Sequence, residues 1–141
     1  MTSTLTALLR QARADRAVLG VFLVTGHYRE IHVRAVGDVW FSARTTGVVS
    51  SEIVVSHNAV RTLTGLSEQE EPGEESSGHP PLRVMLAQLQ RQGTRLVLHC
   101  SGASISGRIA AVGKDFLIYQ KADEGRVVVP LGGFLWLEAC G

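Results

Sequence analysis

The sequence has few of the residues on which metal sites, disulfide frameworks and most catalytic motifs depend. Only two of its 141 residues are cysteine, Cys100 and Cys140, and no C-x-x-C or H-x-x-x-H pair occurs. Such pairs are common zinc-ligand spacings, so we expect neither a metal nor a cofactor. No G-x-S-x-G motif stands between a strand and a helix, and we do not expect an enzyme.

Long hydrophobic runs are also missing. Residues 1–16 have no apolar region of the kind that signal peptides carry, and the run AVLGVFLV that follows is far too short to span a bilayer. We therefore expect a cytoplasmic protein that has no membrane partner. The cytoplasm is reducing, which disfavours disulfides. Cys100 and Cys140 also end two strands that should run antiparallel, so the two residues should lie too far apart to bridge. We therefore expect both to be free thiols.

The small net charge of +1 conceals two basic regions separated by an acidic one. Residues 64–81 contain five glutamates and no lysine or arginine, whereas residues 1–63 and 82–141 each carry a net charge of +3. After Leu66 the acidic stretch has no hydrophobic pattern that could offset the entropy of ordering it. The composition predicts a flexible acidic linker between two units.

Each unit opens with the hydrophobic spacing of a short amphipathic helix. The apolar positions of the first are Leu5, Leu8, Leu9 and Ala12, and those of the second are Leu82, Met85, Leu86 and Leu89. One of Thr2, Ser3 and Thr4 could cap the first helix. Pro80-Pro81 should start the second helix and Gly93 should end it.

Five short strand-like segments follow each helix, in the same order. The clearest match is Ala-Val-Gly, found at residues 35–37 and 111–113, which precedes an acidic turn and an aromatic-rich segment, DVWFSA or DFLIYQ. Offsets between matching segments stay within 74 to 77 residues. We interpret the chain as one unit written twice, with repeats over 1–63 and 82–141. The alternative is one continuous barrel-like domain with accidental internal similarity.

The second unit resembles the Sm-like (LSm) superfamily. The resemblance rests on LHCSGASISGRIAAVGKDFLIYQ and RVVVPLGGFLWLEA, in which Ile105-x-Gly107-x-Ile109 matches the bent second strand of that family. The first unit follows the same pattern more loosely, and its VVSHNAV also resembles the last loop of the bacterial Sm-type RNA chaperone. The resemblance implies an all-β fold with accessory helices, built as two tandem five-stranded Sm-like barrels, each preceded by a short α-helix.

The resemblance also implies a way for such small units to become stable. A domain of about 60 residues buries only about 60% of its unfolded surface, and Sm-like barrels pair the edge of strand four with strand five of a neighbour. The corresponding edges here, residues 53–55 and 127–129, are hydrophobic and would be a liability if left unpaired. We expect the two units to pair with each other, with other chains in a homo-oligomer, or both.

Single-stranded RNA is the partner that the resemblance implies, bound through the loop after strand two and the loop between strands four and five. The matching positions predict RNA-binding residues at Asp38, His57, Asn58, Arg61, Lys114 and Arg126. These would supply base-edge hydrogen bonds and cations for phosphate, and Trp40 or Phe116 could stack on a base if exposed.

Two departures from the family pattern keep a second interpretation open. Neither loop after strand two contains asparagine, and the second unit has Gly132-Gly133 where a polar pair would read a base. The competing hypothesis is a structural or protein–protein interaction module with no role in nucleic-acid binding.

Overall fold

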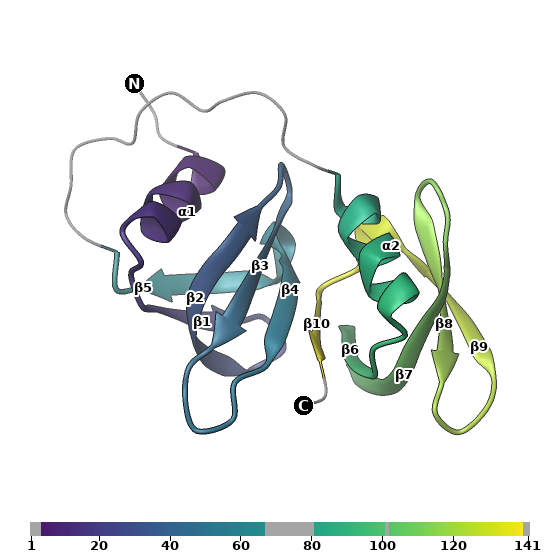
Figure 1. Ribbon diagram of the computed structural model, residues 1–141. Coiled ribbons are helices and arrows are strands. Elements are labelled where there is room, and N and C mark those ends of the chain that lie inside the picture. Colours follow the sequence, from purple (N-terminus) through teal and green to yellow (C-terminus); the bar gives the residue numbers. More distant parts are fainter. Residues whose placement is uncertain (1–3, 67–80, 101, 140–141) are drawn as a thin grey trace.

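The computed structural model describes residues 4–66, 81–100 and 102–139 of the chain. Most of the predicted acidic linker, residues 67–80, lies outside the described residues, as does Cys140. Figure 1 shows two groups of strands side by side, each with one helix. Within the described part of the chain, no helix is both long and apolar enough to cross a membrane.

The two halves contain the same elements in the same order. The first consists of α1 (Leu5–Ala14), β1 (Leu19–Leu23), β2 (Tyr28–Val36), β3 (Trp40–Thr45), β4 (Glu52–Ser56), the 3₁₀ turn η1 (His57–Ala59) and β5 (Val60–Thr64). The second consists of α2 (Leu82–Gln92), β6 (Leu96–Cys100), β7 (Ala103–Val112), β8 (Phe116–Lys121), β9 (Arg126–Pro130), the 3₁₀ turn η2 (Leu131–Gly133) and β10 (Trp136–Ala139).

The helices begin and end where the sequence predicts. Thr4 caps α1, because its side-chain oxygen accepts a hydrogen bond from the backbone N–H of Ala7 at 3.1 Å. Pro81 occupies the N-cap position of α2, and Gly93 ends that helix in the left-handed conformation with φ 64°. Each helix buries its leucine face, and the contacts of α1 and α2 are mainly with β2 and β7 respectively.

All ten strands belong to one antiparallel sheet, in the order β5-β1-β2-β3-β4-β10-β6-β7-β8-β9. Within each half the fifth strand pairs with the first, so the order five-one-two-three-four occurs twice. Both second strands also carry a register shift at the same place, between Val33 and Ala35 and between Ile109 and Ala111. The predicted fold class, β-structure with accessory helices, is therefore confirmed. The strands form one sheet that is continuous across the two halves.

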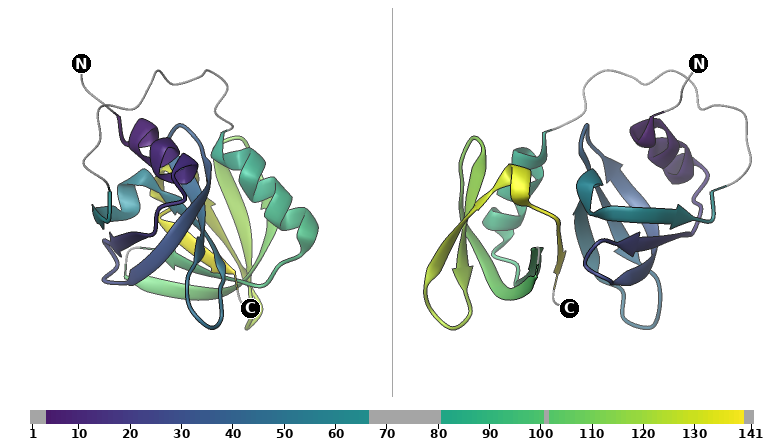
Figure 2. Two further views of the ribbon diagram at one scale, coloured as in Figure 1. Left: turned by 60° about the vertical axis from the view of Figure 1, so that its left-hand side comes forward. Right: turned by 180° about the vertical axis from the view of Figure 1, so that it is seen from behind.

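The pairing of β4 with β10 joins the halves. Trp136 lies opposite Val55, Leu137 opposite Val54 and Glu138 opposite Ile53. The hydrophobic edge at residues 53–55 thus pairs within the chain. Pairing of the two units with each other was one of the alternatives that the sequence predicted. Figure 2 shows β10 between the two halves from two further directions.

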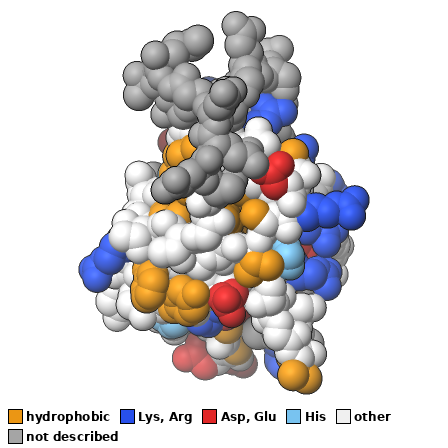
Figure 3. Space-filling view, turned by 90° about the vertical axis from the view of Figure 1, so that its left-hand side faces the viewer, with side chains coloured by type: hydrophobic (Ala, Val, Ile, Leu, Met, Phe, Trp, Pro, Cys, Tyr) orange, Lys and Arg blue, Asp and Glu red, His pale blue; other side chains and the backbone are white. Residues whose placement is uncertain are grey.

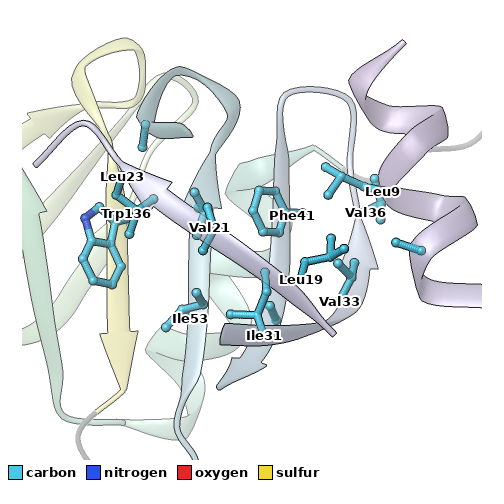
Figure 4. Packing of buried hydrophobic residues seen from close by; sticks show 14 residues of the cluster. Leu9, Leu19, Val21, Leu23, Ile31, Val33, Val36, Phe41, Ile53 and Trp136 are labelled. Carbon is cyan, nitrogen blue, oxygen red and sulfur yellow. The ribbon is translucent and has the colours of Figure 1, made fainter. Parts of the chain in front are cut away.

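The two hydrophobic cores exchange side chains across this junction. Trp136, from the second half, is fully buried in the cluster that contains Val21, Ile31 and Phe41 of the first half (Figure 4). Conversely, Trp40 and Val54 pack in the cluster of the second half. Because each core is completed by the other half, separation of the halves would expose tryptophan surface on both sides.

Gly107 lies at a close approach of β7 to β8. A Cβ atom at this position would overlap the carbonyl oxygen of Gln120, a backbone atom that cannot move without disturbing the ladder. Gly107 pairs with Lys121 in the bent part of the sheet. Glycine in a strand interior commonly marks such an approach of two backbones.

Replacement of Gly107 by alanine should therefore lower the free energy of unfolding by about 2 kcal/mol, because the added methyl forces the two strands apart. Urea denaturation measures this change. Gly132 is the matched control, since a Cβ there meets no atom within 4 Å, and Gly132→Ala should change stability by less than about 0.5 kcal/mol. Equal losses in the two variants would contradict the assignment.

Candidate nucleic-acid interface

In the first half, the loop after the second strand meets the turn between the fourth and fifth strands. The backbone N–H of His57 in η1 donates to the carbonyl oxygen of Val39 at 2.9 Å. The Thr6 hydroxyl of α1 donates to the carbonyl oxygen of Asp38 at 3.3 Å. Asp38, His57 and Asn58, three of the predicted site residues, are thus brought to one corner of the molecule.

The His57 ring is suited to hydrogen bonding rather than to holding a phosphate by charge. Burial lowers its pKa below the usual value for histidine, and the opposing effect of Asp38 is smaller. Its Nε2 atom is buried and makes no hydrogen bond to the described residues. Asn58 is exposed beside it, whereas Arg61 lies further along, exposed on the edge strand β5.

The corresponding corner of the second half has the same backbone frame. The N–H of Leu131 donates to the carbonyl oxygen of Asp115 at 2.9 Å, as His57 does to Val39. Lys114 is exposed at this corner. Gly132 and Gly133 contribute no side chain to it, so the corner carries Lys114 and Asp115 but no counterpart of His57 and Asn58.

Arg126 is not part of the Lys114 corner. It pairs with Gln120 at one end of the β8–β9 ladder, whereas the corner lies beyond the pair Phe116–Pro130 at the other end. Four residues of strand separate them, about 13 Å. The Arg126 Nε atom donates to Oε1 of Gln120 at 3.0 Å, which holds the guanidinium at the β8–β9 hairpin.

Neither candidate aromatic residue offers an open stacking face. Trp40 is 1% exposed within the core cluster of the second half. Phe116 is half-buried, and its ring lies directly against Gly113. The condition for Trp40 to stack on a base was exposure, and it is not met, because Trp40 is buried in the core of the second half.

Lys114 instead lies beside two cations that the sequence does not single out. A groove of about 460 Å³ runs between α2 and the corner that joins β7 to β8. Its walls carry Arg83, Arg91 and Lys114, and none of its lining residues is acidic. The remaining wall is largely apolar, from Val84, Ala87 and Val112. An anionic ligand with apolar parts matches this combination.

The first half shows how differently the same frame can be used. The residues equivalent to Arg83, Arg91 and Lys114 are Thr6, Ala14 and Asp38, by the offsets of the matching helices and corners. Thr6 is buried, and its hydroxyl bonds the carbonyl of Asp38, so helix and corner are in contact there. Comparison of the two helices and the two corners position by position would have identified the three differences, two on the helix and one in the corner.

A second polar cluster lies where the halves join. Arg29 of β2 forms a bidentate ion pair with Glu138 of β10, through N–O distances of 3.0 and 3.1 Å. The Ser51 hydroxyl donates to the same carboxylate at 3.3 Å. Burial alone would raise the pKa of Glu138, but Arg29 and Ser51 outweigh it, so this pKa is lowered. Glu138 is therefore ionised at neutral pH.

Two histidines far apart in sequence meet in this cluster. The His99 ring stacks on Trp136 at 3.9 Å between centroids, and His27 lies 4.6 Å from His99. His27 immediately precedes β2, outside the strand. Among the residues described, no group of three or more His, Cys, Asp or Glu side chains is placed to hold a metal ion.

Cys100, at the end of β6, is a free thiol, and burial raises its pKa. It is therefore protonated and weakly nucleophilic at neutral pH. This environment gives no indication of a reactive cysteine.

Comparisons of the chain with models of known protein families, with curated proteins and with solved structures give no match.

Acidification should destabilise the fold through His99. Its pKa is lowered to about 4, by burial first and then by His27, whereas an unfolded histidine titrates near 6.5. The unfolded chain therefore gains a proton between pH 6.5 and 4 that the folded chain does not. Stability should be complete above pH 6.5 and fall by about 2 kcal/mol at pH 5, as urea denaturation at each pH would measure.

The control is His99→Phe, which introduces the residue found at the equivalent position, Phe22. Phenylalanine keeps an aromatic ring against Trp136 but cannot titrate. The variant should lose most of the pH dependence and keep only the smaller contribution of His57, whose pKa is also lowered. A variant with the pH dependence of the wild type would show that His99 is not the responsible group.

Proposed function

We propose that the chain is a tandem Sm-like binding and assembly module, two small barrels joined edge to edge, that binds single-stranded RNA. The repeated strand order, the shared register shift and the close approach at Gly107 support the Sm-like interpretation. The module acts in the cytoplasm without catalysis or a cofactor.

The groove between α2 and the β7–β8 corner is the observation that carries the RNA hypothesis. Arg83, Arg91 and Lys114 come from a helix and a loop that are about thirty residues apart, yet they line one groove without an acidic residue. Cations arranged in this way attract the phosphates of a nucleic acid and release its counterions. Val84 and Val112 provide apolar surface for a sugar or a base.

The first-half corner would supply recognition that the groove lacks. The exposed Asn58 amide can donate to and accept from base edges, and Nδ1 of a neutral His57 can add one hydrogen bond, since Nε2 is buried. Arg61 is exposed on the strand that follows η1 and could contact a phosphate. Affinity would then depend mainly on the second half, and base preference on the first.

Fluorescence anisotropy with U-rich and A-rich strands of about ten nucleotides tests this proposal. The variant Arg83→Ala/Arg91→Ala/Lys114→Ala should bind at least about tenfold more weakly, because three phosphate contacts are lost. The slope of log affinity against log salt should fall by about 2, at about 0.7 per contact. His57→Ala/Asn58→Ala should reduce the difference between the two strands more than the affinity itself.

The matched control is Arg13→Ala/Arg34→Ala/Arg44→Ala, which removes the same charge from exposed positions of the first half. It should weaken binding much less than the groove variant. Equal weakening by both would indicate a nonspecific effect of net charge. No binding by the wild type at low salt would overturn the RNA proposal.

A specific observation also favours an assembly role, which would remain if RNA were not bound. Val54 of β4 is fully buried against the second half, whereas its equivalent on β9, Val128, is 64% exposed. Strand β9 ends the sheet on one side and β5 ends it on the other. The chain thus presents the fourth strand of its second half and the fifth strand of its first half as free edges. The corresponding strands of the other halves, β4 and β10, pair with each other inside the chain.

The surface beside β5 is apolar enough to receive a neighbour. Phe22 of β1 and Tyr28 of β2 are each more than 40% exposed, with ring centroids 4.5 Å apart. Figure 3, which looks onto this side, shows hydrophobic side chains at the surface. By equivalence with the β4–β10 register, Val128 of one copy would lie opposite Leu63 of the next.

Sedimentation velocity over a range of concentrations tests this assembly. The wild type should self-associate, and Val128→Lys should shift the distribution to the single chain, because a charge would enter an apolar contact. Val48→Lys is the control, since Val48 is fully exposed in the β3–β4 loop and away from both edges. A wild type that stays a single chain at every concentration would contradict head-to-tail pairing.

A further inference from the structure

A second basic hollow lies at the opposite end of β8 from Lys114. Its volume is about 340 Å³, and its lining includes Arg95, Arg108 and Lys121. These cations come from three segments: the turn before β6, the strand β7 and the end of β8. In the ladder, Gly107 lies opposite Lys121 and Arg108 opposite Gln120, so Arg108 and Lys121 belong to successive pairs at this end of β7 and β8.

The three cations have no acidic partner among the residues that the structure describes. The ion pair of Arg29 with Glu138 lies on the far side of β6. Glu124 also lines the hollow, from the β8–β9 hairpin, but it does not lie within 4 Å of any of the three. Three cations and one carboxylate leave the hollow with an excess of positive charge, which an anion bound there would offset.

The hairpin beside the hollow is held independently of these cations. The Gln120 amide nitrogen donates to the carbonyl oxygen of Gly125 at 3.0 Å, and its oxygen accepts from Arg126. The shape of the hollow therefore does not depend on Arg95, Arg108 or Lys121, and substitutions of these residues should leave it in place.

The first half again lacks this feature. The residues equivalent to Arg95, Arg108 and Lys121 are Val18, His32 and Thr45. Thr45 is buried and accepts a hydrogen bond from the N–H of Ser51 at 2.8 Å. The second half thus differs from the first by cations at three further positions, as it does at the groove.

Helix α2 connects the two basic regions. Its last turn carries Arg91, in the groove, and Arg95 follows four residues later in the hollow, with Gly93 reversing the chain between them. Figure 1 shows α2 alongside β7 and β8, between the β7–β8 corner and the β8–β9 hairpin. The helix is about 16 Å long, a span that several nucleotides of one strand can cover.

From this arrangement we infer that the hollow of Arg95, Arg108 and Lys121 binds a further phosphodiester of the strand held in the groove. The inference rests on the proposed RNA function and adds the path that the bound RNA follows over the second half. Arginine forks suit the two unesterified oxygens of a phosphodiester. Glu124, a carboxylate at the same hollow, opposes the anion, so its charge limits the affinity.

The length of the strand separates the hollow from the groove in an experiment. Anisotropy is measured with uridine strands of about 4 and about 10 nucleotides, which should reach one region or both. Arg108→Gln/Lys121→Gln should weaken binding of the longer strand about fivefold to tenfold and lower its salt slope by about 1. Affinity for the shorter strand should change by less than about twofold.

Two control variants test whether the effect on binding depends on charge and whether it arises at the hollow. Glu124→Gln removes the opposing charge and should strengthen binding of the longer strand only. Arg34→Gln/Arg44→Gln removes two exposed cations from the first half and should not reproduce the dependence on length. Opposite effects of Glu124→Gln and Lys121→Gln would not arise from a purely structural role.

Several results would overturn the inference while leaving the proposed function intact. The groove variant could lose binding while the hollow variant matches the wild type at both lengths. Equal losses for both strands would indicate a general charge effect. If inorganic phosphate at constant ionic strength abolished the advantage of the longer strand, the hollow would be a site for free phosphate. Failure of the wild type to bind either strand would instead remove the proposed function.

Discussion

The pairing of β4 with β10 is the constraint on which the rest of the molecule depends. Each half is too small to bury its own tryptophan: Trp136 completes the first core and Trp40 packs in the second. The ladder brings Arg29 to Glu138 and His27 to His99, so the polar contacts of the junction follow from the strand register. This partly buried ion pair contributes little to stability and orients the two strands, whereas the exchanged aromatic side chains bury most of the apolar surface at the junction.

Once the halves share one sheet, the two copies are no longer equivalent. The first copy gives its fourth strand to the junction and the second gives its fifth, which leaves β5 and β9 at the two ends. The second copy also has basic residues where the first has Thr6, Ala14 and Asp38. The same order of elements thus carries two different surfaces, one apolar beside β5 and one basic beside α2.

The local elements could be predicted because they depend on short-range patterns. The leucine spacing, Thr4 and Gly93 define the helices, and the two Ala-Val-Gly corners have matching backbone hydrogen bonds in the structure. The groove could not be predicted from such patterns. Arg83 and Lys114 meet because α2 packs on β7, and neither residue is unusual in its own segment. His27 and His99 likewise meet only through the junction.

The sequence by itself determined the two-fold repetition of a helix and five strands, because periodicity, caps and turn glycines act within a few residues. It also predicted that the hydrophobic edge at residues 53–55 would be paired, as it is with β10. Only the tertiary structure decided which edge pairs inside the chain, which tryptophan is buried by which half, and which cations share a groove. Those outcomes depend on contacts between residues 30 to more than 100 positions apart, and a linear pattern does not specify which distant surfaces come together.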